Sequence, residues 1–242
     1  MLDFVAMKAA LGTVKPVNAF MKERGFDIRL NDRLGPMDIA AACVFELKAF
    51  WEEAGETIDI RMEKTGRGVP GTSLKAIDFF QSKNHPQPVV LLKNDQNINI
   101  YVSKIDKMNP GSVFELYQFV RLLSNSLTAL ENDYSELRCP MISMKISGEV
   151  SWLKGAFTQR KGENPHIIRE AKAEHILRLN ETGTLAKAAV ISAVLDWSWR
   201  MSHDNPYIID GPFVIWYEVD GVILFCAKIE EDAMKRPPGL DR

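Results

Sequence analysis

Two dense apolar runs close to the C-terminus constrain the fold most strongly. They span residues 213–217 and 222–226, and both are rich in apolar, β-branched and aromatic side chains. The sequence Val219-Asp220-Gly221 lies between them, and an Asp-Gly pair in this position is a strong hairpin signal. The sequence therefore predicts a buried β-hairpin with alternating residues inside: Phe213, Ile215, Val222 and Leu224, or their neighbours.

A run of small residues comes before the hairpin. The tetrapeptide Glu181-Thr182-Gly183-Thr184 leads into residues 185–194, which are rich in alanine. Leu185, Lys187 and Ile191 share one face of this run if it is extended. Such a segment could slide between two strands of a sheet, but an ordinary buried strand or a short alanine-rich helix fits the same residues. Because side chains alternate along a strand, the other face holds only small or β-branched residues: Thr184, Ala186, Ala188, Val190, Ser192 and Val194.

These motifs, in this order, resemble the C-terminal third of the serpin family. Glu181-x-Gly183-Thr184 followed by alanines resembles the serpin hinge. Asp210-Gly-Pro212-Phe213 resembles the Asp-x-Pro-Phe sequence that opens the final strand pair, and Ile223-Leu224-Phe225 resembles its last strand. The resemblance implies an inhibitor of serine or cysteine proteases that presents a reactive-centre loop around residues 184–209. In serpins the cut loop enters the sheet as an added strand.

The resemblance also implies where a protease cuts. Counting forward from Glu181 places the scissile bond at Trp197-Ser198, and counting back from Pro212 places it at Met201-Ser202. These positions are four residues apart, so the loop is longer than in an inhibitory serpin. The predicted hinge and reactive-loop residues are Glu181, Gly183, Thr184, Ala186, Ala188, Trp197, Ser198, Arg200, Met201 and Ser202.

Two functions stay open at this point. The first is a protease inhibitor or pseudosubstrate that presents residues 195–203, a stretch with no consistent apolar face, as is typical of an exposed loop that proteases cut first. The second is a non-inhibitory serpin-fold protein that binds a protein partner. The long loop, together with Leu185 and Lys187 in the hinge, favours the second, because a longer loop lets a bound protease finish hydrolysis before it is distorted.

Earlier segments extend the resemblance. Residues 17–23 resemble serpin helix F, and the apolar run over residues 38–50 resembles the central strand that follows it, although periodicity alone allows a helix there. Trp51 is implied as the tryptophan beside the site where the loop first inserts. A full serpin has several helices and two strands before helix F. The resemblance therefore implies one α+β serpin-like domain over residues 1–242, with a mixed central sheet, the C-terminal hairpin and packed helices, that lacks most N-terminal helices. Such a chain is either a reduced serpin or an N-terminally truncated one.

The remaining segments are assigned from their periodicity and turn residues. Ser112 and Glu115 form a capping box at the start of the most regular helix, which the sequence predicts over residues 112–130. Its predicted apolar stripe is Val113, Leu116, Tyr117, Val120 and Leu123. Other predictions are a helix over 2–11, a helix from Pro16 to Gly25, a turn at Pro86 and Pro88, strands over 57–64, 89–92, 98–105 and 138–146, and a frayed tail over 236–242. The resemblance implies one further strand, over residues 167–179, that runs into the hinge.

Composition and spacing argue against several other classes of function. The net charge of −2 indicates no nucleic-acid partner, and no apolar stretch is long enough to cross a membrane. The N-terminus lacks the pattern of a signal peptide, and three widely spaced cysteines suit buried, reduced thiols, so we expect a cytoplasmic protein. The four histidines have no metal-ligand spacing and no nucleophile elbow occurs, so we expect no cofactor and no enzyme. A hydrolase site assembled from distant residues is the alternative.

Overall fold

The structure is a computed structural model that describes residues 5–12, 14–31, 40–96, 98–105, 110–131, 134–149, 155, 157–158, 166–167, 170–186 and 205–240. These residues form two α-helices, a short 3₁₀ helix and seventeen strands, so the predicted α+β class is confirmed. The chain divides into two compact units. The first contains Met1–Leu47 and Met144–Leu177, and the second contains Lys48–Ser143 and Arg178–Asp241. That residues 1–242 act as a single domain stays a prediction.

The strands form four sheets. The five-stranded sheet has the order β1 (Val5–Gly12), β2 (Ala40–Phe50), β14 (Gly183–Ala186), β13 (Lys172–Leu179), β10 (Ile142–Glu149). The six-stranded sheet has the order β17 (Val222–Ile229), β16 (Phe213–Val219), β7 (Asn99–Lys104), β6 (His85–Leu92), β5 (Ile77–Ser82), β8 (Leu127–Ala129). A four-stranded sheet joins β15 (Pro206–Ile208), β9 (Glu136–Pro140), β4 (Gly68–Leu74) and β3 (Glu56–Arg61), and a short pair joins β11 (Phe157–Thr158) and β12 (His166–Ile167).

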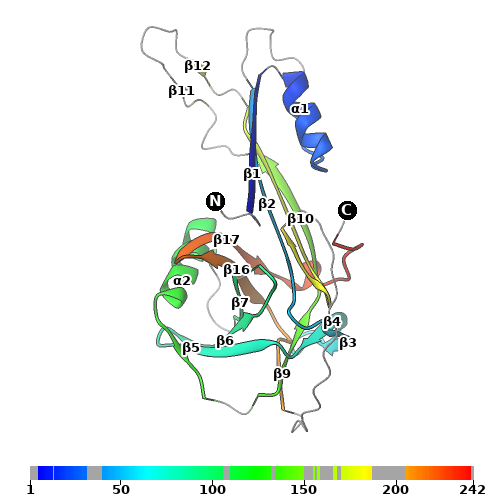
Figure 1. Ribbon diagram of the computed structural model, residues 1–242, viewed down its shortest axis with the longest axis vertical. Coiled ribbons are helices and arrows are strands. Elements are labelled where there is room, and N and C mark those ends of the chain that lie inside the picture. Colours follow the sequence, from blue (N-terminus) through cyan, green and yellow to red (C-terminus); the bar gives the residue numbers. More distant parts are fainter. Residues whose placement is uncertain are drawn as a thin grey trace. The chain divides into compact units, whose positions relative to one another are not determined.

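In the first unit, a helix and a strand pair occupy the N-terminal segment (Figure 1). β1 pairs antiparallel with β2 along its whole length, from Val5 opposite Leu47 to Gly12 opposite Ala40. The predicted helix over residues 2–11 is therefore wrong, because the ladder to a distant strand outweighs the helix propensity of the alanines. The predicted strand before Trp51 is confirmed as β2. α1 (Val14–Glu23) contacts β1 and buries Val14 and Val17, and Gly25 ends it at φ 77°.

Charged side chains hold the segment that follows α1. The Glu174 side chain is 1% exposed, and its carboxylate accepts hydrogen bonds from the backbone N–H groups of Asp27 and Ile28, each at 3.1 Å. Lys172 donates to the carbonyl of Arg29 at 2.7 Å. Lys145 pairs with Asp27 and also with Glu174. The carboxylate of Glu174 is thus a buried charge whose acceptor oxygens are occupied by several donors.

In the second unit, the first strand of the C-terminal hairpin, β16, belongs to the buried core, whereas β17 is the edge strand of its sheet. β16 and β17 pair around Asp220 and Gly221, both at positive φ, as a two-residue hairpin turn requires. Every residue of β16 except Glu218 is buried. Val222 of β17, by contrast, is 58% exposed, and residues 223–226 are only half-buried, so the predicted burial of this strand is wrong over residues 222–226. Val222 lies beside the turn, where the sheet ends.

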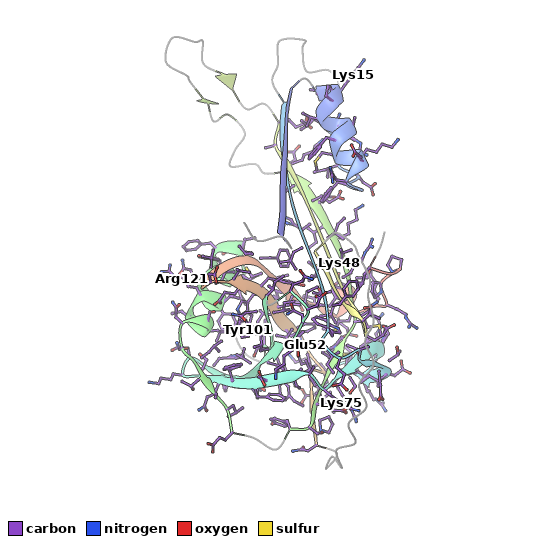
Figure 2. The ribbon with its side chains drawn as sticks, in the orientation of Figure 1. Lys15, Lys48, Glu52, Lys75, Tyr101 and Arg121 are labelled. Atoms are coloured by element: carbon purple, nitrogen blue, oxygen red, sulfur yellow. The ribbon has the colours of Figure 1, made fainter. Side chains whose placement is uncertain are left out.

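α2 (Val113–Ser124) covers one face of the six-stranded sheet and lies beside β17 (Figure 1). Tyr101 of β7, labelled in Figure 2, belongs to the same buried cluster as the inner side chains of α2. Arg121, also labelled, lies on the outer side of the helix. The predicted cap is confirmed, since Ser112 accepts a hydrogen bond from the N–H of Glu115 at 3.2 Å. The buried side chains of α2 are Leu116, Phe119, Val120 and Leu123, whereas Val113 is 82% and Tyr117 is 39% exposed.

Two boundary predictions in this unit are also wrong. α2 ends at Ser124 instead of Leu130, because residues 127–129 pair with β5 as β8. Pro86 and Pro88 lie within β6 instead of a turn. They are tolerated because the pairing of β6 with β7 covers only Val90–Leu92 in the described register, and the pairing with β5 is irregular near Phe80.

Candidate functional site

The first residues of the predicted loop form a strand in the five-stranded sheet. β14 lies between β2 and β13. It runs antiparallel to β13, with Thr184 opposite Leu179 and Leu185 opposite Arg178. Thr184 is fully buried and Leu185 is 1% exposed, so both faces of the short strand are covered. The first residues of the predicted hinge are therefore part of this sheet.

A turn at Asn180 joins β13 to this strand. The Asn180 side-chain oxygen accepts hydrogen bonds from the N–H groups of Thr182 at 2.9 Å and Gly183 at 3.2 Å. The Thr182 hydroxyl donates to the same oxygen at 2.8 Å, and the Asn180 N–H donates to the carbonyl of Gly183 at 3.0 Å. An asparagine side chain that closes its own turn in this way fixes the direction in which β14 leaves β13.

Glycine is the only residue type that fits at position 183, at the start of β14. A Cβ there would meet the carbonyl oxygen of Ala49 well inside van der Waals contact, and would lie 3.0 Å from the Cα of Phe50. Both atoms belong to the backbone of β2, which cannot move aside as a side chain can. The glycine of the predicted hinge therefore lets β14 approach β2.

Trp51 contacts the hinge turn directly. It is 6% exposed and follows β2; Lys48 and Glu52, labelled in Figure 2, mark this part of the chain. Its indole Nε1–H donates to the carbonyl of Asn180 at 2.9 Å, and its backbone N–H donates to the carbonyl of Thr182 at 3.1 Å. The structure thus brings Trp51 to the start of the loop. Its role in insertion stays a prediction.

Thr184 and Tyr217 form a buried pair of hydroxyls. The Thr184 hydroxyl donates to the carbonyl of Arg178 at 2.8 Å and lies 2.6 Å from the Tyr217 hydroxyl. Because the single Thr184 proton goes to the carbonyl, Tyr217 donates to Thr184. Burial raises the pKa of Tyr217 well above its usual range. Tyr217 therefore stays a neutral donor at physiological pH.

Glu181 lies on the turn with one oxygen engaged. Its Oε1 pairs with Arg236 at 3.4 Å, and its Oε2 is buried without a hydrogen-bond partner among the described residues. The backbone carbonyl of Glu181 accepts the N–H of Gly55 at 2.7 Å. The turn is thus held by its backbone and by a side chain from far along the chain.

The motif that resembles the opening of the final strand pair is also anchored. The Asp210 carboxylate accepts a hydrogen bond from Lys104 at 2.6 Å, and Lys104 also pairs with Glu63 at 3.1 Å. Burial lowers the pKa of Lys104, but the hydrogen bonds to Asp210 and Glu63 together raise it. The carbonyl of Pro212 accepts the N–H of Ile105 at 2.8 Å. These bonds fix the chain where it returns to the core before β16.

The predicted site residues divide into two groups. Glu181, Gly183 and Thr184 lie together at the turn and in β14, with Ala186 as the last residue of that strand. Ala188, Trp197, Ser198, Arg200, Met201 and Ser202 lie outside the described residues. Sequence reasoning missed Tyr217, Arg178 and Arg236, because nothing local marks a hydroxyl or guanidinium as the partner of a distant turn. Asn180 could have been found, since Asn-x-x-Gly after a strand is a turn signal.

Metal, thiol and membrane chemistry have no support at this site. No group of three or more His, Cys, Asp or Glu side chains gathers in the described part of the chain. Cys139 is buried as predicted, whereas Cys226 is only half-buried. Burial raises the pKa of Cys139 to about 12, so that thiol is protonated at neutral pH. None of the helices in the described ranges has the length and apolar character to span a membrane.

Comparisons with known proteins identify the architecture. No family model and no curated protein matches the sequence. Among solved structures, a highly specific serpin of the insect Tenebrio molitor matches with a TM-score of 0.61 at 13% identity, over 94% of this chain and 76% of that one. Human thyroxine-binding globulin complexed with thyroxine matches with a TM-score of 0.60 at 12% identity, over 93% of this chain and 75% of that one.

The chain has the serpin fold. A further match is the mouse protein-Z dependent protease inhibitor, with a TM-score of 0.61 at 11% identity, over 93% of this chain and 73% of that one. The recognition made from the hinge and hairpin motifs is confirmed at the level of fold, and the chain spans about three quarters of these serpins. The matches include a protein named as a protease inhibitor and a thyroxine-binding globulin, so the fold by itself leaves the activity open.

Proposed function

We propose that this serpin-fold protein is a protease inhibitor or pseudosubstrate whose loop extends β14 into the five-stranded sheet when it is cut. The observation that carries the proposal is the position of β14 between β2 and β13. A strand of the loop has to enter at this place in the sheet, and its first residues are already there. The target would be a protease that recognises residues 195–203, and the protein would act as an inhibitor without catalysing a reaction itself.

The register of β14 predicts where further residues would lie. Thr184 is opposite Leu179, and Leu185 is opposite Arg178. Continuing one residue at a time places Ala186 opposite Leu177 and Ala188 opposite His175. Directly opposed side chains share a face in an antiparallel pair, so Ala188 would join the face of Thr184 and Leu179. His175, the residue opposite Ala188, is exposed in the chain as it stands, and an added strand would cover it. Lys187 would lie on the other face.

A test of insertion needs a residue that becomes buried only when the strand extends. Thr184 is already buried before any cleavage, so a substitution there cannot report on insertion alone. An arginine there would disrupt the uncleaved chain as well. Ala188→Arg is the sharper probe, because it would bury an unpaired charge only if the strand extends, at a cost of several kcal/mol. Lys187→Arg is the matched control on the opposite face.

The experiment measures Tm before and after limited proteolysis within residues 195–203. We expect cleavage to raise Tm in the unmodified protein and in Lys187→Arg, and to leave Tm unchanged in Ala188→Arg. A gel with a panel of serine and cysteine proteases should show an SDS-stable covalent complex. Simple cleavage with no complex and no rise in Tm would refute the inhibitory proposal.

A second candidate function is non-inhibitory binding of a protein partner. The position of β14 between β2 and β13 also favours this function. Because part of the loop already lies in the sheet, cleavage would raise the free energy of unfolding by less. The greater length of the loop acts in the same direction. In that case, cleavage would leave Tm unchanged in all three proteins. The free thiols of Cys139 and Cys226 support a reducing, cytoplasmic setting for either function.

A further inference from the structure

We propose that residues 234–240 form a strap that holds the hinge turn, so that the strap sets how readily β14 leaves the sheet before any cleavage. The inference goes beyond the proposed function, because it concerns the uncleaved chain. It would apply equally to an inhibitory or a non-inhibitory protein. Its physical basis is a set of contacts between the strap and both sides of the turn.

The strap is anchored at each end by buried apolar residues. Met234 is 1% exposed and forms a β-bridge with Ile142 of β10, and Leu240 is 6% exposed. Pro237 between them is buried, and two consecutive prolines reduce the conformational freedom of the segment. The predicted frayed tail is therefore wrong over residues 236–240. Polar and proline-rich composition suggested fraying, but the two apolar anchors are buried by distant parts of the core.

Two arginines connect the strap to the hinge. Arg178, at the end of β13, donates from Nη1 to the carbonyl of Gly239 at 3.1 Å. The backbone carbonyl of Arg178 accepts the Thr184 hydroxyl, so this residue contacts the strap and the hinge strand at once. From the strap, Arg236 pairs with Glu181 on the turn at 3.4 Å. The strap therefore contacts Arg178, which precedes the turn, and Glu181, which lies on the turn.

The two contacts differ in expected strength. The Arg236 side chain is 61% exposed, and ion pairs in such positions contribute little. The Arg178 bond is partly buried and joins a charged donor to a carbonyl, which is a stronger arrangement. Gly239 has φ 124°, a conformation that other residues rarely adopt. The carbonyl that receives Arg178 thus depends on a glycine at this position.

This glycine allows the strap to be tested without altering the hinge. A Cβ at Gly239 would meet open space, so Gly239→Ala acts only through backbone strain. Gly68 in β4 is the matched control, because its Cβ would also meet open space and its φ is ordinary. For the ion pair, Arg236→Gln is matched by Lys235→Gln, which removes an exposed cation from the neighbouring position.

The measurement is amide hydrogen exchange of the full uncleaved chain, followed in peptides that cover residues 180–186 and, as a reference, β7. We expect Gly239→Ala and Arg178→Met to speed exchange in the hinge by about tenfold, with β7 unchanged. Arg236→Gln should speed it less than threefold, and both controls should match the unmodified protein. The double variant Gly239→Ala/Arg178→Met should be no faster than the faster single variant, because both remove the same contact.

Two results would contradict the proposed role of the strap. One is unchanged hinge exchange in both Gly239→Ala and Arg178→Met. The other is an equal increase in the hinge and in β7, which would indicate general loss of stability. Neither result depends on whether cleavage raises Tm, so failure of the strap and failure of the inhibitory proposal can be told apart.

Discussion

Removing either hydroxyl of the buried pair Thr184 and Tyr217 should lower the free energy of unfolding, but by different amounts. Tyr217→Phe removes one donor, and the Thr184 hydroxyl keeps its bond to the carbonyl of Arg178. This variant leaves no buried donor without a partner, so we expect it to lower the free energy of unfolding by about 1 kcal/mol. Thr184→Val keeps the shape of the side chain but strands the Tyr217 hydroxyl in a fully buried site. We expect that change to cost about 2–3 kcal/mol.

The assay is urea unfolding of the two single variants and the double variant. In the double variant both hydroxyls are absent, so the stranded donor disappears and the total loss should fall below the sum of the single losses by about 1 kcal/mol. Tyr117→Phe is the control, since that ring is 39% exposed and should change the free energy of unfolding by less than about 0.5 kcal/mol. Equal costs for the single variants, or additive losses in the double variant, would contradict the geometry described for the hinge.

Three further predictions concern the surroundings of the hinge and the first unit. Gly183→Ala should lower the free energy of unfolding by about 2 kcal/mol or more, measured by urea, because its Cβ would overlap the backbone of β2. Trp51→Phe should cost about 2 kcal/mol in the same assay, since it leaves a small cavity and removes the donor to the Asn180 carbonyl; a change below experimental error would mean the indole bond does not hold the turn. The hydrogen bond with Lys145 lowers the pKa of Asp27, so the stability from this pair is present above the unfolded pKa and is lost as pH falls through the lower folded value. Asp27→Asn should therefore flatten the loss of Tm below about pH 4 and leave the pH dependence near neutrality unchanged.

The sequence by itself determined the features that depend on neighbouring residues. The turn at Asp220 and Gly221 requires positive φ at both positions. The Asp-Gly dipeptide alone indicates such a turn. The helix cap at Ser112 and the stop at Gly25 are local in the same sense. The hinge and strand motifs were sufficient to recognise the serpin fold, because they combine special backbone positions with a fixed order along the chain.

Only the tertiary structure decided the features that depend on distant partners. Residues 5–12 became a strand because β2 offers a ladder along their whole length. Thr184 is buried before any cleavage because Tyr217 and the carbonyl of Arg178 satisfy its hydroxyl. The segment 236–240 is packed against the core because Arg178 and the apolar anchors hold it. In each case the stabilising group lies far away in the sequence, and no periodicity or composition in the segment itself records which partner it will meet.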